Sequence, residues 1–142
     1  MSRRILAVVV ASALLGIACV HEGSDAPQPV AMTASDKVPA ASGQFEVSKA
    51  GNGNTALHVA VSNMAPPQKV AAGATTYVVW VRPLAPDGHA QNIGALRIDG
   101  NLQGALDSVT PLHAFDVFVT PEQSPAAEAP RGQALLWGRV GQ

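Results

Sequence analysis

Residues 75–82 read TTYVVWVR, a run that is rich in β-branched and aromatic side chains. Both of its alternating sets of positions are largely apolar, which is typical of a central strand covered on its two faces. Trp80 is the largest side chain of the run, and we predict that it anchors the core. Pro83 and the PDG turn at residues 86–88 then end the strand.

Two strands with one apolar face each are expected before this run. Residues 44–48 (QFEVS) and 57–62 (LHVAVS) alternate apolar and polar side chains, the pattern of half-buried strands. Residues 51–54 (GNGN) lie between them and favour the positive backbone angles of a tight hairpin. We therefore predict that these two strands pair, and that the prolines within residues 64–67 end the second strand.

Further strands are expected after the run. Residues 93–99 and 102–106 flank a Gly-Asn pair at residues 100–101, which is a second hairpin signal. In residues 114–119, Phe115, Val117 and Val119 alternate with Ala114, Asp116 and Phe118, and residues 134–140 form the last predicted strand.

Seven short strands with close turns, and no amphipathic helix, predict an all-β fold. We expect a small two-sheet antiparallel sandwich of the Ig-like kind over residues 44–142, with a small barrel as the alternative. Residues 121–130 are broken by prolines and are expected to form a long exposed connection between the last two strands.

Three segments of this predicted sandwich resemble the extracytoplasmic domain of anti-sigma-K factors. They are residues 77–81 (YVVWV), 93–96 (IGAL) and 115–125 (FDVFVTPEQSP), which are similar to the family's Tyr-x-x-Trp strand, glycine-containing strand and Glu-Pro, Gly-Ser-Pro loop. The resemblance implies a β-sandwich outside the cytoplasm. An anti-sigma factor also has a sigma-binding domain and a transmembrane helix, for which we find no counterpart here, so we do not extend sigma regulation to this chain.

The first 19 residues resemble a bacterial lipoprotein signal. Arg3 and Arg4 precede an apolar run that is too short to span a bilayer comfortably, and residues 15–19 (LGIAC) are similar to the lipobox that ends such signals. The resemblance implies cleavage of residues 1–18, the lipoprotein signal peptide, and lipidation of Cys19. The alternatives are an ordinary signal with a chance cysteine and a twin-arginine signal.

Lipidation of Cys19 would hold the protein to a membrane without crossing it. At about 0.8 kcal/mol per buried methylene, two or three acyl chains anchor a protein stably. Val20 stands where an aspartate would retain a lipoprotein at the inner membrane, so the resemblance implies an outer-membrane location facing the periplasm if the source is Gram-negative. Residues 19–43 are then the lipidated cysteine and a flexible tether rich in Ala, Pro and Ser.

The charge balance and the cysteine count restrict the function and the fold further. The chain carries 9 basic and 10 acidic residues, and loss of Arg3 and Arg4 with the signal would change its net charge from −1 to −3. This balance excludes nucleic acid as a partner, because no basic footprint is left to bind it. Cys19 is the only cysteine, so no intrachain disulfide can form and the fold must depend on its core.

No motif points to a catalytic or metal centre, and we predict neither an enzyme nor a bound cofactor. The histidines lack metal-ligand spacing, the aspartates are scattered over turns and strands, and the serines lack a glycine-flanked nucleophile elbow. These residues are His21, His58, His89, His113, Asp99, Asp107, Asp116, Ser108 and Ser124. His58 and His113 could meet across the sandwich, but satisfied or exposed histidines are the simpler interpretation. Turn geometry explains Asp99, with calcium binding as the less favoured alternative.

One candidate contact surface remains. Trp137 and Arg139 share a face of the last predicted strand, and Arg82 shares a face with Trp80. A tryptophan exposed beside its arginine would make that face a contact surface. For Trp80 and the other strand aromatics, burial is the preferred interpretation; these are Tyr77, Phe115 and Phe118.

Two functions follow as hypotheses. The preferred one is a non-enzymatic lipoprotein of the cell envelope, anchored to a membrane through Cys19, whose sandwich is a structural or protein-interaction module with an envelope protein as partner. It predicts a packed domain without a deep polar pocket. The alternative is a sensory or small-ligand-binding domain related in fold to the anti-sigma-factor domains, which predicts a concave site with converging polar groups.

Overall fold

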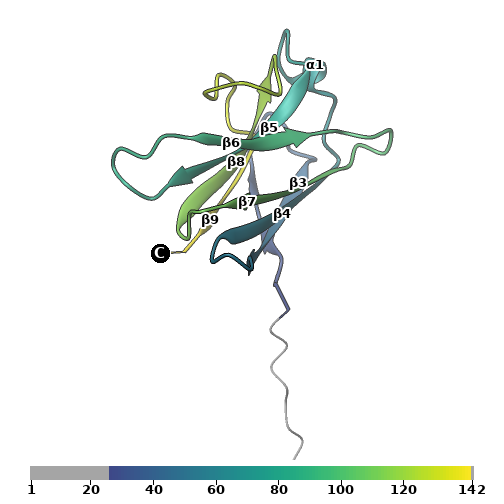
Figure 1. Cartoon of the computed structure of the whole chain (residues 1–142). Helices are drawn as coiled ribbons and strands as arrows, with labels where there is room; N and C mark the ends of the chain where they lie inside the picture. Colours follow the sequence, from purple (N-terminus) through teal and green to yellow (C-terminus); the bar gives the residue numbers. More distant parts are fainter. Residues whose placement is uncertain (1–25, 142) are drawn as a thin grey trace, which may run out of the picture.

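The computed structural model describes residues 26–141, which form two antiparallel β-sheets that face each other (Figure 1). The four-stranded sheet has the order β1 (Val30–Ala31), β3 (Ser42–Lys49), β4 (Thr55–Ser62) and β7 (Gly104–Thr110). The five-stranded sheet has the order β2 (Thr33–Ala34), β9 (Leu136–Val140), β8 (Phe115–Glu122), β5 (Thr76–Pro83) and β6 (Gln91–Leu96). One short helix, α1 (Pro67–Val70), follows β4 within the described residues. The predicted all-β two-sheet sandwich is confirmed.

The first predicted hairpin is present. β3 and β4 pair in antiparallel register from Ser42 opposite Ser62 to Lys49 opposite Thr55. The turn between them closes with a hydrogen bond from the Ala50 amide to the Asn54 carbonyl oxygen, and Gly53 adopts a φ of +83°. The glycine is needed at this position because a residue with a Cβ adopts a positive φ only at a cost.

The second predicted hairpin is wrong. β6 pairs with β5 in the five-stranded sheet, whereas β7 pairs with β4 in the four-stranded sheet, so the turn between β6 and β7 passes the chain from one sheet to the other. The turn itself is well made, because Asp99 Oδ1 accepts hydrogen bonds from the amides of Asn101 and Gln103 at 2.8 and 3.0 Å. Turn residues specify the local reversal of the chain but not which ladder the flanking strands join.

The prediction of a flexible tether through residue 43 is wrong for its last part. Residues 30–31 and 33–34 form β1 and β2, and the chain moves from the four-stranded to the five-stranded sheet at Met32 between them. Three apolar side chains of this segment are buried in the core, namely Met32, Val38 and Ala41. Two-residue strands show no periodicity that a sequence pattern could reveal, and single apolar residues among Pro, Ala and Ser resemble a linker. The sandwich therefore begins before Gln44.

Strand β5 is covered on both faces, as its sequence predicts. Tyr77, Val79 and Val81 point into the space between the sheets and belong to the main core with the fully buried rings of Phe45 and Phe115. The Tyr77 hydroxyl donates a hydrogen bond to the Ala65 carbonyl oxygen, and burial raises the pKa of Tyr77 to about 12.

Trp80 does not anchor this main core. It is fully buried, but it forms a second, smaller cluster with Val78 and Phe118. Ala127 and Ala134 pack against this cluster from the connection between β8 and β9. The tryptophan therefore lies on the outer face of the five-stranded sheet, beneath a segment of loop.

A buried carboxylate fixes that loop. Glu122 Oε1 accepts hydrogen bonds from the Thr120 hydroxyl at 2.6 Å and from the Arg131 and Gly132 amides at 2.9 and 3.2 Å. Thr120 Oγ1 in turn accepts a hydrogen bond from Trp80 Nε1 at 2.8 Å. The predicted long connection is thus present, but it starts after Glu122, because residues 121 and 122 still pair with β5.

Gly138 in β9 provides a test of the packing between the sheets. A Cβ at this position would collide with the Phe45 ring, so we expect Gly138→Ala to lower the free energy of unfolding by about 2 kcal/mol. Gly51→Ala is the matched control, since a Cβ there meets nothing within 4 Å. Urea unfolding followed by circular dichroism measures both, and equal stability of the two variants would contradict this packing.

Candidate functional site

The outer face of the five-stranded sheet carries two rows of side chains that cross three strands. The antiparallel registers place Arg82 opposite Asp116 and Asp116 opposite Arg139. The neighbouring row, two residues along each strand, consists of Trp80, Phe118 and Trp137. A charged row therefore lies beside an aromatic row on β5, β8 and β9.

The charged row is a connected network. Arg139 donates two hydrogen bonds to the Asp116 carboxylate, from Nε to Oδ1 at 2.7 Å and from Nη2 to Oδ2 at 3.3 Å. Arg82 Nη2 donates a third to Oδ2 at 3.2 Å. The hydrogen bond from Arg139, helped by that from Arg82, lowers the pKa of Asp116 against the opposing effect of burial, and the same contact raises the pKa of Arg139. One carboxylate thus orients two guanidinium groups.

The aromatic row changes from buried to exposed along its length. Trp80 is fully buried, Phe118 is 8% exposed and Trp137 is 40% exposed. The Arg82 guanidinium lies 5.5 Å from the centre of the Phe118 ring, a cation–π distance. Trp137 is thus the part of this row that can stack on another molecule.

Charged and aromatic residues together line a hollow of about 310 Å³. We call it the arginine–tryptophan surface, and its side chains are Arg82, Asp116, Phe118, Ala134, Trp137 and Arg139. The side chains of Arg82 and Arg139 are 50% and 63% exposed, whereas that of Asp116 is 18% exposed. The guanidinium groups are therefore accessible while the carboxylate that holds them is largely covered.

The structure brings together all three predicted contact residues, which are Arg82, Trp137 and Arg139. The exposed tryptophan is Trp137, and the preferred burial of Trp80 is confirmed. The sequence alone does not identify Asp116 as part of this site, because its position between two arginines depends on the register of three strands. The binding of a partner to this surface stays a prediction. The predicted lipidation site, Cys19, lies outside the described residues.

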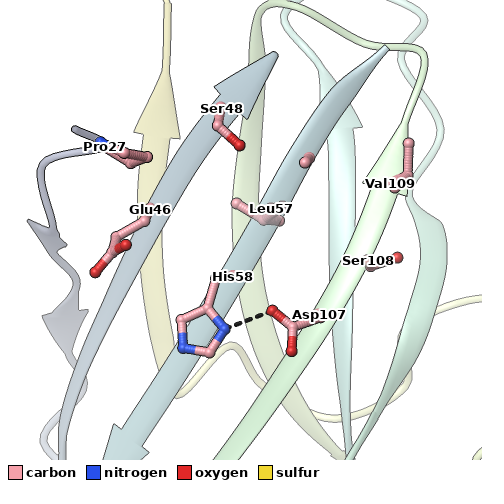
Figure 2. A pocket seen from close by; sticks show the side chains of 9 residues that line it. Pro27, Glu46, Ser48, Leu57, His58, Asp107, Ser108 and Val109 are labelled. Carbon is pink, nitrogen blue, oxygen red and sulfur yellow. Dashed lines mark hydrogen bonds and ion pairs between the residues drawn. The ribbon is translucent and has the colours of Figure 1, made fainter. Parts of the chain in front are cut away.

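A second group lies on the outer face of the four-stranded sheet (Figure 2). His58 Nδ1 is 2.6 Å from Asp107 Oδ1, and Glu46 is the partner of His58 on the opposite strand β3. His58 therefore does not meet His113, whose Nδ1 lies 3.2 Å from the Thr55 hydroxyl oxygen. Within residues 26–141, no three His, Cys, Asp or Glu side chains are arranged to hold a metal ion.

A larger hollow, of about 660 Å³, lies beside α1, between that helix and the end of β6. Its polar lining residues are Gln68, Thr75, Thr76, Arg97 and Asp99. Asp99 Oδ1 is already used by the turn that links the two sheets. The hollow is thus lined by several polar groups together with apolar residues that include Leu96 and Ile98.

Comparison with known proteins adds no relative. No protein-family model, curated protein or solved structure matches this chain. In the part of the chain that the structure describes, no helix is long and apolar enough to cross a membrane.

The Asp116 network makes stability depend on pH. The folded-state pKa of Asp116 lies below its ordinary value of 3.8, so the network contributes stability above that value, and the contribution is lost as the pH falls through the folded pKa. We expect Asp116→Asn to lower the free energy of unfolding by about 1 kcal/mol at neutral pH, and by less at about pH 2, which lies below the ordinary pKa of the carboxyl and where the stabilising contribution decreases.

The matched control for this variant is Asp87→Asn, which changes an exposed aspartate in the loop after β5. Urea unfolding of the native chain and both variants at the two pH values measures the difference. A loss in Asp116→Asn that is the same at both pH values, or no greater than in the control, would contradict the network.

Proposed function

We propose that this chain is a lipid-anchored lipoprotein of the cell envelope, and that its sandwich is a non-catalytic module that binds another envelope component. The observation that carries the binding role is the exposed Trp137 beside two arginines that Asp116 holds in place. Large exposed aromatic residues next to arginines are typical of the energetically dominant parts of binding surfaces.

The proposed anchor rests on the LGIAC sequence at residues 15–19. Because β1 begins at Val30, the chain between Cys19 and the sandwich is much shorter than residues 20–43 would have allowed. Residues 26–30 enter the sandwich at the end opposite α1 (Figure 1). An anchored sandwich would therefore lie close to the lipid surface with α1 at its far end, facing the periplasm if the anchor is in an outer membrane.

The second candidate is a sensory or small-ligand-binding domain related in fold to the anti-sigma-K extracytoplasmic domains. The 660 Å³ hollow beside α1 favours it, because its volume is in the range of small-molecule sites and several polar groups line it. It differs from the first candidate in the place of binding, which would be this hollow and not the outer face of the five-stranded sheet.

Metabolic labelling tests the anchor. In cells grown with an alkyne-bearing fatty acid, we expect the native chain to take up the label and to fractionate with membranes, because Cys19 becomes acylated. Cys19→Ala is expected to lose both properties. A native chain without label, or an equally labelled Cys19→Ala, would contradict the proposed anchor.

The same cells test the place of binding. A photo-crosslinking amino acid in place of Thr33, which pairs with Trp137 on the neighbouring strand, is expected to form envelope adducts that Arg82→Gln and Arg139→Gln weaken. The same amino acid in place of Gln68 probes the hollow beside α1. Adducts only from residue 68 would favour the second candidate, and adducts from neither position would contradict both.

A further inference from the structure

We propose that the arginine–tryptophan surface binds an acidic sugar residue, a pyranose ring that carries a carboxylate or a phosphate. This inference rests on the proposed binding role of the same surface and names the chemistry of what binds there.

The surface offers hydrogen-bond donors in excess. Two guanidinium groups carry ten N–H donors, and the Asp116 carboxylate accepts three hydrogen bonds from them. Seven donors are left on side chains that are half or more exposed. Asp116 itself is largely covered and already accepts from both arginines. A ligand for this surface must therefore supply acceptor oxygen atoms.

The local charge favours an anion. Two guanidinium groups against one carboxylate leave one positive charge in the hollow, although the chain as a whole has a net charge of −1. Carboxylate and phosphate groups match the planar donor pattern of arginine, and such charge-assisted hydrogen bonds are the stronger kind. Because Asp116 already orients both guanidinium groups, the two arginine side chains lose less conformational entropy when a ligand binds.

The large exposed apolar group of the surface is one indole. Five large hydrophobic residues are exposed in the described chain, and of these only Trp137 lines the hollow. The C–H face of a pyranose ring is flat and apolar, whereas its rim carries oxygen atoms. A sugar ring stacked on Trp137 would therefore present its oxygen atoms toward the neighbouring row of arginines.

The size of the hollow favours a sugar over a folded protein. Its volume of about 310 Å³ is at the lower end of the range for small-ligand sites. A stable protein interface buries about 800 Å² on each partner and has an apolar centre, for which one exposed indole is a small contribution. A single ring with one acidic group fits the available donors, charge and apolar area together.

Binding can be measured with the mature full-length lipoprotein in detergent micelles. Tetragalacturonate is the acidic sugar probe, maltotetraose is the neutral sugar probe, and tetraglutamate is an acidic probe without a sugar ring. A separate comparison of glucose 1-phosphate with glucose tests whether a phosphate group is also accepted. We expect tetragalacturonate to bind, to alter Trp137 fluorescence, and to bind at least about tenfold more tightly than the other two tetramers. Tighter binding of glucose 1-phosphate than of glucose would assign phosphate, rather than carboxylate, as a second accepted acid group.

Variants locate the site. Arg82→Gln combined with Arg139→Gln, and separately Trp137→Ala, should each weaken tetragalacturonate binding about tenfold or more, with unchanged circular dichroism. Arg97→Gln removes an exposed arginine that lines the other hollow and should leave binding unchanged. The proposal is overturned if neither acidic sugar binds, if maltotetraose or tetraglutamate binds as well as tetragalacturonate, or if Arg97→Gln weakens binding as much as the double variant.

The outcome separates this inference from the proposed function. Envelope adducts from residue 33 without any sugar binding would overturn the acidic-sugar assignment and leave the binding role of the surface in place. No adducts from residue 33 and no sugar binding would overturn both.

Discussion

The buried carboxylate of Glu122 determines which part of the outer face of the five-stranded sheet is covered by a loop and which part is exposed. Strand β5 presents Val78 and Trp80 to this face, and an indole there needs both apolar cover and a partner for its N–H group. The relay from Trp80 through Thr120 to Glu122, continued to the Arg131 and Gly132 amides, supplies the partner and holds the covering loop. A buried carboxylate without these donors would be costly, so loop and strand stabilise each other.

The proposed binding surface is what this loop leaves uncovered. Asn92 Nδ2 donates hydrogen bonds to the Pro125 and Ala127 carbonyl oxygens and so holds the loop over the β6 side of the sheet. On the β9 side the sheet face remains open, where Asp116 fixes two arginines beside the exposed Trp137. The connection between β8 and β9 therefore covers the β6 side of this sheet face and leaves the β9 side exposed.

Regular strands could be predicted from the sequence, whereas the sheet that each strand joins could be predicted only in part. The two apolar faces of residues 75–82 identified the central strand, and the GNGN turn identified the β3–β4 hairpin. The turn at residues 100–101 and the short strands near Met32 were misinterpreted, because both depend on which sheet the chain joins. Alternation along β9 was enough to group Trp137 with Arg139, whereas Asp116 enters the site only through cross-strand register.

Selective quenching of the two tryptophans tests the division of this face most directly. In folded single-tryptophan variants, iodide should quench Trp137 several-fold more strongly than Trp80, because the former is 40% exposed and the latter fully buried. In Trp137→Phe, a further Glu122→Ala change should expose Trp80 to the quencher while circular dichroism still shows strands. Equal quenching of the two tryptophans in folded protein, or a Trp80 that stays protected without Glu122, would contradict the account.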